Sequence, residues 1–161
     1  MSDHARPATL RGHVALVTDG GRGLGAAIAL ALAAAGATVA TLAHESCELT
    51  AVAAMLRLGG HQTLGVTAPD YADAAAVAEA IDAARDYLGP ITILVDVVGL
   101  PTVLADVLPD MAAAGWGCFI TSLPAAAPGP GIAWLQLAPT APPEATAAQV
   151  RDFCLAALPP A

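Results

Sequence analysis

The sequence predicts an α/β fold in which three layers are built around a doubly wound parallel sheet of about six strands. Apolar runs of strand length alternate along the chain with alanine-rich segments of helix length, as they do in βαβ units. These runs are uninterrupted by charged residues, which is typical of parallel strands buried on both faces. The 161 residues fit one domain, and no internal repeat divides them. We therefore expect a single domain over residues 1–161, with a flexible polar tail at 1–10.

The first half of the chain is expected to hold three strands and three helices. Apolar and β-branched runs predict strands at 13–18, 37–43 and 62–66. Helices are expected at 26–35, 46–58 and 73–88. The third helix is the most regular, because Val77, Ile81 and Ala84 recur at helical spacing. Asp73 is its natural N-cap, and Ser46 is the expected N-cap of the second helix.

The second half continues this alternation less regularly. Strands are expected at 91–95, 117–121 and 132–138. Helices are expected at 103–114, which contains Pro109, and at 144–158. Proline-rich loops at 124–131 and 139–143 flank the sixth apolar run.

Composition and charge exclude several classes of protein. Hydrophobic residues make up 57% of the chain and charged residues 12%, with a mean hydropathy of +0.65, so the chain is not intrinsically disordered. Six basic residues against fourteen acidic residues give a formal charge of −8, which argues against nucleic-acid and membrane-surface partners. The uncharged stretch 24–43 has the length of a membrane span, but Gly36 interrupts it, and a helix–turn–strand pair explains it better.

The cysteines predict neither a disulfide framework nor a metal site. Cys47, Cys118 and Cys154 lie far apart without a Cys-x-x-Cys spacing. Their odd number suits a reducing compartment, and the segment 1–10 does not have the pattern of a signal peptide. We expect a soluble, cytoplasmic protein.

A glycine-rich turn joins the first expected strand to the first expected helix. It reads Thr-Asp-Gly-Gly-Arg-Gly-Leu-Gly over residues 18–25. In that setting backbone N–H groups and the helix dipole can hold a pyrophosphate, and glycines allow its close approach. The candidate cofactor-binding residues of this turn are Gly21, Arg22, Gly23 and Gly25.

These features resemble the short-chain dehydrogenase/reductase family. The resemblance covers residues 11–99, including the glycine turn, the acidic step Asp70-Tyr71-Ala72-Asp73 and the run before the fourth strand's end, and it resumes at 107–117 and in the sixth strand. It implies a Rossmann-like fold and assigns Asp70 as the carboxylate at the edge of an adenine. Past the second strand the family selects NAD with an acidic residue or NADP with a basic one. At the matching positions this chain has Ala43 and His44, which select neither nucleotide clearly. His44, like Asp70, is a candidate cofactor-binding residue outside the turn.

The chain departs from the family at several positions. Asp19 stands where the family's turn has its first glycine, and a carboxylate there is expected to repel a pyrophosphate. The chain contains no lysine, so the family's Tyr-x-x-x-Lys pair cannot form within it. A helix with its loops is missing between 99 and 102, and again between 131 and 132. The resemblance therefore implies a truncated, degenerate member for which no cofactor is required, although NAD(P) remains possible.

The candidate catalytic residues are Asp19, Asp96 and Ser122. Asp19 and Asp96 end the first and fourth strands, which are neighbours in a doubly wound sheet. Their carboxylates are expected to face each other, separate their pKa values and act as general acid and base, with Ser122 in support. The structural alternative is that Asp96 caps backbone N–H groups in place of an asparagine and that Asp19 caps a helix.

These residues lead to three hypotheses for function. The first is a non-redox enzyme, of the cyclase, isomerase or dehydratase type, acting on an apolar small molecule in bacterial specialised metabolism. The second is a non-catalytic binding or partner-stabilising subunit, and the third is an atypical NAD(P)-dependent oxidoreductase. The missing helices would uncover apolar surface, so we expect a homodimer or a heteromer with a related subunit.

Overall fold

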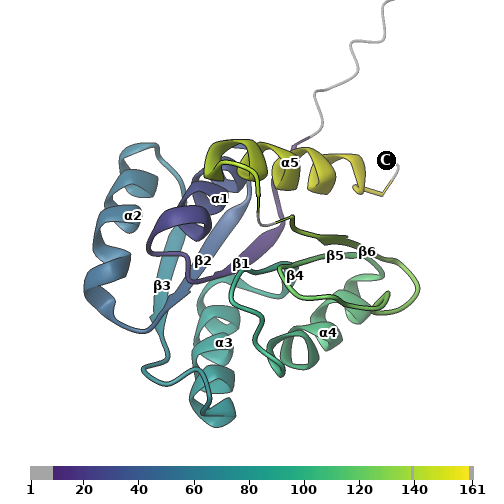
Figure 1. Ribbon diagram of the computed structural model, residues 1–161, viewed down its shortest axis with the longest axis horizontal. Helices are drawn as coiled ribbons and strands as arrows, with labels where there is room; N and C mark the ends of the chain where they lie inside the picture. Colours follow the sequence, from purple (N-terminus) through teal and green to yellow (C-terminus); the bar gives the residue numbers. More distant parts are fainter. Residues whose placement is uncertain (1–8, 139, 160–161) are drawn as a thin grey trace, which may run out of the picture.

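The computed structural model describes residues 9–138 and 140–159, which form one six-stranded parallel sheet with helices on both faces (Figure 1). The strands run in the order β3-β2-β1-β4-β5-β6, so the predicted α/β, doubly wound fold is confirmed. The strands are Val14–Thr18 (β1), Thr38–Ala43 (β2), Thr63–Thr67 (β3), Ile91–Asp96 (β4), Gly117–Thr121 (β5) and Ile132–Gln136 (β6). The helices are Gly23–Ala34 (α1), Ser46–Leu58 (α2), Ala74–Leu88 (α3), Val103–Ala114 (α4) and Pro143–Ala156 (α5).

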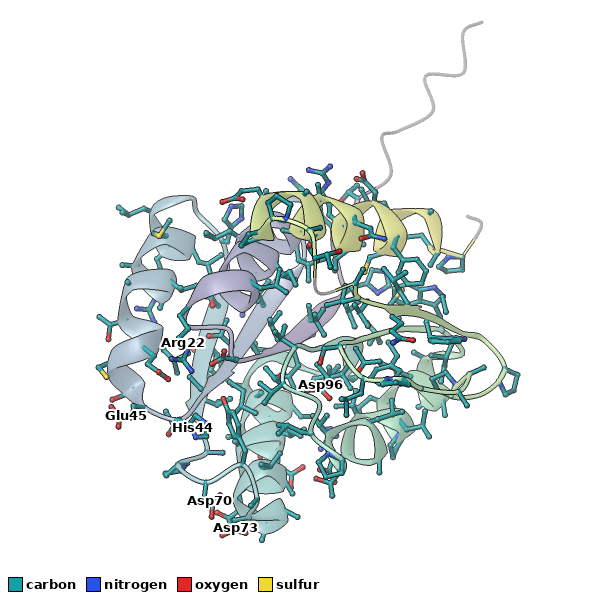
Figure 2. All side chains as sticks on the ribbon, viewed as in Figure 1. Arg22, His44, Glu45, Asp70, Asp73 and Asp96 are labelled. Atoms are coloured by element: carbon teal, nitrogen blue, oxygen red, sulfur yellow. The ribbon has the colours of Figure 1, made fainter. Side chains whose placement is uncertain are left out.

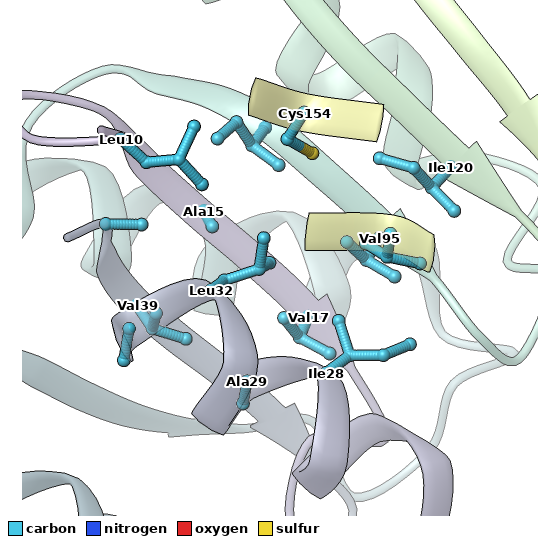
Figure 3. Packing of buried hydrophobic residues seen from close by; sticks show 14 of the residues in the cluster. Leu10, Ala15, Val17, Ile28, Ala29, Leu32, Val39, Val95, Ile120 and Cys154 are labelled. Atoms are coloured by element: carbon cyan, nitrogen blue, oxygen red, sulfur yellow. The ribbon is translucent and has the colours of Figure 1, made fainter. Parts of the chain in front are cut away.

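Two hydrophobic cores cover the two faces of the sheet. Side chains of a strand alternate between faces, so Ala15 and Val17 of β1 enter one core while Val14 and Leu16 enter the other. The first core lies under α1, α2 and α5 (Figure 3), and the second lies under α3 and α4. Burial on both faces explains why the strands appear as uninterrupted apolar runs in the sequence.

The parallel register brings the carboxyl ends of four strands to one edge of the sheet. Thr18 of β1 pairs with Leu42 of β2, and Asp96 of β4 pairs with Thr121 of β5. β1 lies between β2 and β4, with β2 on one side and β4 on the other. The chain therefore turns in opposite directions after β1 and after β4, and this switch of direction opens a crevice at the carboxyl ends of the strands.

The ends of some elements differ from the predictions. α1 begins at Gly23 rather than at residue 26, because the helix starts inside the glycine turn. Ser46 is the first residue of α2 and not its N-cap; Glu45 takes that position, without a side-chain cap. Asp73 caps α3 as predicted, since its carboxylate accepts hydrogen bonds from Ala75 and Ala76.

Of the tail predicted at residues 1–10, the structure describes only residues 9 and 10. Leu10 does not behave as part of a tail, because its side chain is fully buried and its N–H donates to the Ala35 carbonyl at 2.8 Å. Residues 1–8 lie outside the described part of the chain. Within the described residues, every helix is too short or too polar to cross a bilayer.

Candidate functional site

The crevice at the switch point between β1 and β4 is where an open α/β sheet binds its ligand. A hollow of about 840 Å³ lies instead at the opposite edge of the sheet, where Arg11, His61 and Arg151 line it together with the C-terminal end of α1. The C-terminus of a helix carries partial negative charge, which these arginines offset. Because open α/β sheets bind their ligands at the switch point, the candidate site is the crevice.

The glycine turn is built by close contacts that only glycine permits. A Cβ on Gly25 would lie 2.2 Å from the Asp19 carbonyl oxygen, and one on Gly21 would lie 2.6 Å from the Glu48 carbonyl oxygen. Gly25 thus lets α1 approach the end of β1, and Gly21 lets the turn approach α2. Gly23 differs, because it has a φ of +50° and nothing within 4 Å of its Cβ position. The turn is thus tightly packed where Gly21 and Gly25 lie and open to solvent at Gly23.

The N-terminus of α1 is available to an anion. Arg22 is the N-cap, and its side chain makes no capping hydrogen bond. The first turn of the helix contains no acidic side chain. The first N–H groups of a helix lack intrahelical partners and carry partial positive charge. Those of this helix therefore form a cradle of the kind that holds phosphate groups.

Asp19 occupies the glycine position of the turn in a glycine-like conformation. Its φ is 51°, a region that Asp and Asn adopt more readily than other side chains. Its carboxylate accepts a hydrogen bond from Arg22 Nε at 3.3 Å, and Glu48 Oε1 lies 3.8 Å from the same nitrogen. The charge of Asp19 raises the pKa of Arg22. Arg22, three residues further along the chain, therefore offsets part of the repulsion expected from Asp19.

Asp96 is a structural cap in this structure. The side chain is 3% exposed, and its Oδ1 accepts from Thr18 Oγ1 and from Gly99 N, both at 3.0 Å. Its Oδ2 accepts from Leu100 N at 2.7 Å. Thr18 Oγ1 in turn accepts from Val97 N at 2.9 Å. The network ties the loop after β4 to the end of β1, as the structural alternative for Asp96 predicts.

The two candidate carboxylates do not form an acid–base pair. Asp19 turns toward Arg22, while Asp96 is held by Thr18 and the backbone. Burial raises the pKa of Asp96, and its hydrogen bonds lower it in part. A neighbouring carboxylate is not needed to explain that shift. Each carboxylate is thus hydrogen-bonded to other groups, and no hydrogen bond among the described residues joins Asp19 to Asp96.

His44 and Tyr71 form a stacked pair beside the turn. Their ring centroids lie 3.7 Å apart. His44 Nδ1 lies 3.2 Å from the Pro69 carbonyl oxygen, which can only accept, so Nδ1 carries the proton. Tyr71 donates to the Leu42 carbonyl at 3.4 Å, and burial, supported by the charge of Asp19, raises its pKa to about 12. His44 is thus anchored past β2 with its other ring nitrogen facing away from Pro69.

Asp70 and Ser122 complete the predicted set at the two ends of the crevice. The Asp70 carboxylate accepts from Ala72 N at 2.8 Å, which closes a local turn and leaves the side chain exposed. Figure 2 shows Arg22, His44 and Asp70 on the same side of the molecule, with Asp96 nearer the centre of the view. Ser122 follows β5, and its N–H donates to the Asp96 carbonyl at 3.1 Å. The catalytic and binding roles assigned to these residues remain predictions.

Sequence reasoning missed two acidic residues beside the turn, Glu45 and Glu48. In Rossmann sites an acidic residue about 20 positions beyond the glycines binds a ribose hydroxyl, and that spacing could have identified them. Glu45 accepts from Cys47 Sγ at 3.3 Å. Glu48 lies beside Arg22, and its Oε2 is buried without a hydrogen-bond partner among the described residues.

The sheet order, the glycine turn and the open N-terminus of α1 define a Rossmann-type dinucleotide-binding domain. The sequence pattern of the family described as short chain dehydrogenase matches residues 13–120. The chain therefore belongs to the short-chain dehydrogenase family.

The curated relatives match part of the chain. An uncharacterised oxidoreductase of Mycobacterium tuberculosis is 45% identical over a segment that covers 53% of this chain and 32% of that protein. D-threitol dehydrogenase of Mycolicibacterium smegmatis is 43% identical over 56% of this chain and 35% of that protein. The matched segments thus span about a third of the length of these relatives.

Solved structures share the fold more completely. A metagenomic short-chain oxidoreductase in complex with NADP superposes with a TM-score of 0.75 over 92% of both chains, at 22% identity. A 3-oxoacyl (acyl-carrier-protein) reductase from Agrobacterium tumefaciens with NADP bound is 28% identical, with a TM-score of 0.63 over 74% of this chain and 56% of that one.

These similarities overturn two of the predictions. The non-redox function, of the cyclase, isomerase or dehydratase type, is wrong, because the relatives are named as oxidoreductases and dehydrogenases. The prediction that no cofactor is required is wrong as well, because members of the family were solved with NADP bound. The physical error lay in treating Asp19 as an isolated charge, whereas the structure pairs it with Arg22.

Proposed function

We propose that this chain binds a nicotinamide dinucleotide at its glycine turn and acts in NAD(P)-dependent oxidation and reduction. The observation that carries the proposal is the uncapped N-terminus of α1, with Gly23 open in front of it. The names of the relatives and the NADP complexes of similar structures support the same function. This is the third of the hypotheses drawn from the sequence.

The residues present fit the phosphate and ribose part of such a cofactor. The backbone N–H groups at the start of α1, with Gly21, Gly23 and Gly25 keeping the approach clear, would hold the pyrophosphate. Asp70 and His44 lie on the adenosine side of the turn and have free polar atoms to offer. When bound, the nicotinamide supplies or accepts a hydride.

The Asp96 network would keep the crevice in shape for the nicotinamide. Thr18 and Asp96 fix the loop 97–100, which borders the crevice between β1 and β4. Val98 and Leu123 are exposed at this border, 42% and 47% respectively. An apolar border of this kind would favour an apolar substrate.

The chain's own residues do not provide the family's proton-donating pair. None of the 161 residues is a lysine, so the lysine that assists the family's catalytic tyrosine is not among them. Ser122 is the hydroxyl at the end of β5 that could polarise a substrate carbonyl. The proposed oxidoreductase therefore needs a proton donor other than the family's tyrosine–lysine pair.

Calorimetric titration of the protein with NAD and NADP tests the proposal. Gly23→Ala places a methyl group in the open front of the turn, so we expect affinity to fall about tenfold or more, since the cofactor's phosphates need close backbone approach. Gly115→Ala is the matched control, because Gly115 also has a positive φ, +67°, and open space around its Cβ position. Failure of the unaltered protein to bind either nucleotide would refute the proposal.

A second candidate is a nucleotide-binding subunit that leaves catalysis to a related partner. The lack of lysine favours it, as does β6, an edge strand whose Trp134 is 37% exposed. Oxidation of NADH by the chain alone, with a panel of ketones, would separate the two candidates. Turnover without a partner supports the oxidoreductase, and nucleotide binding without turnover supports the subunit.

A further inference from the structure

We propose that Asp19 and Glu48 make this site select NAD over NADP by holding Arg22 between them. The inference rests on the proposed function, since it concerns the nucleotide that the site would bind. It assigns a role in specificity to Asp19, the residue that replaces the first glycine of the family's turn.

The two nucleotides differ only in a phosphate on the 2′-hydroxyl of the adenosine ribose. Rossmann sites hold that phosphate with a nearby arginine, or hold the free hydroxyl with an acidic side chain about 20 residues beyond the glycines. Both kinds of residue are present here. Arg22 lies in the turn, and Glu45 and Glu48 follow it at about the required distance in the sequence.

Arg22 is already engaged by two carboxylates. Its Nε is 3.3 Å from Asp19 Oδ1 and 3.8 Å from Glu48 Oε1, and these carboxylates are only 23% and 24% exposed. With one positive and two negative charges, the group is negative overall. A 2′-phosphate carries close to two negative charges near neutral pH. It would therefore have to compete for Arg22 against carboxylates that also repel it.

Glu48 has an unused acceptor that suits a hydroxyl rather than a phosphate. Its Oε2 is buried and has no hydrogen-bond partner among the described residues, which costs free energy. A 2′-hydroxyl that reached this oxygen would give it the donor that it lacks. A phosphate offers no such donor at neutral pH, so the same carboxylate disfavours NADP.

Asp19 can be neutralised without changing the backbone. Its φ of 51° lies in the left-handed region, which Asn tolerates at least as well as Asp. Asp19→Asn therefore removes the charge and keeps the shape of the turn. Glu48→Gln is the independent second variant, and Asp86→Asn, on an exposed face of α3 away from the turn, is the matched control.

The experiment measures dissociation constants for NAD and NADP by calorimetry in the unaltered chain and the three variants. We expect the unaltered chain to bind NAD about tenfold more tightly, and Asp19→Asn and Glu48→Gln each to reduce that ratio by about fivefold, mainly through tighter binding of NADP. Raising the salt concentration should also reduce the ratio, because screening weakens exposed charges. Asp86→Asn should leave it unchanged.

The outcomes separate this inference from the proposed function. If the unaltered chain binds both nucleotides but prefers NADP, or if neither Asp19→Asn nor Glu48→Gln changes the ratio, the inference is overturned while the proposed function stands. If it binds neither nucleotide, both fail. A ratio that falls with either variant and not with Asp86→Asn supports the inference.

Discussion

Asp96→Asn should destabilise the fold, although the resemblance to the family suggests that an asparagine belongs in this loop. The carboxylate uses both oxygens as acceptors, one for Thr18 Oγ1 and Gly99 N and the other for Leu100 N. An amide has one acceptor oxygen and one NH₂ donor. Whichever way the amide turns, its NH₂ group faces at least one backbone N–H that now points at an acceptor.

The magnitude follows from the hydrogen bonds that are lost. A hydrogen bond to a charged group contributes about 1.5–3 kcal/mol, and leaving a buried donor unpaired has a similar cost. Removing the buried charge recovers part of this. We therefore expect Asp96→Asn to lower the free energy of unfolding by about 2 kcal/mol, and Asp96→Ala, which leaves every one of these donors unpaired, by about 4 kcal/mol.

Urea unfolding followed by circular dichroism measures the effect, with the slope of the transition as a check that the unfolded state is unchanged. Asp86→Asn is the control, because an exposed side chain of this kind changes stability by less than about 0.5 kcal/mol. An Asp96→Asn protein as stable as the unaltered chain would refute the reasoning. It would mean that the loop after β4 does not depend on a carboxylate.

The remaining predictions concern pH, packing and thiol reactivity. Burial raises the pKa of Tyr71 to about 12, so the folded state keeps a proton that the unfolded chain releases. The free energy of unfolding should therefore fall as the pH rises from about 10 to about 12, by about 1 kcal/mol because solvent screens the half-buried side chain. Urea titrations across that pH range should show that Tyr71→Phe removes this loss. Gly25→Ala should prevent stable folding or cost more than about 3 kcal/mol, since its Cβ would lie 2.2 Å from the Asp19 carbonyl oxygen; a normal melting temperature would contradict it. Cys47 is exposed while Cys118 and Cys154 are buried, so a thiol reagent should modify one cysteine in the native state and three after unfolding.

The sequence was sufficient for the elements that depend on buried apolar surface. Strands of five or six residues buried on both faces leave short continuous apolar runs, and their length and β-branched residues distinguish them from buried helix segments. The cap of α3 could also be predicted, because Asp73 acts only on the backbone two and three residues beyond it. The start of α1 could not, because glycines are poor helix formers. It is the packing of Gly25 against Asp19 that starts the helix inside the turn.

The candidate site was predicted as a set of positions but not as a set of interactions. Topology alone places Asp19, His44, Asp96 and Ser122 at one edge of the sheet, since each follows or ends a parallel strand. Which partner each side chain takes depends on distances of a few ångströms, and the order of residues does not determine these distances. The hydrogen bonds of Asp96 to Thr18 and to the backbone, for example, could not be predicted from the sequence.

Asp19 shows why a departure from a family's pattern is a poor guide to loss of function when it is considered alone. A carboxylate at a phosphate site is repulsive only if its charge is uncompensated. The left-handed backbone conformation, for which the family uses a glycine at this position, also directs the carboxylate of Asp19 toward Arg22 in the same turn. Glu48 from α2 adds a second carboxylate beside the same guanidinium, and the N–H groups of α1 remain uncapped by any side chain in the described residues. We therefore propose that the substitution changes which nucleotide is preferred and does not remove the nucleotide site.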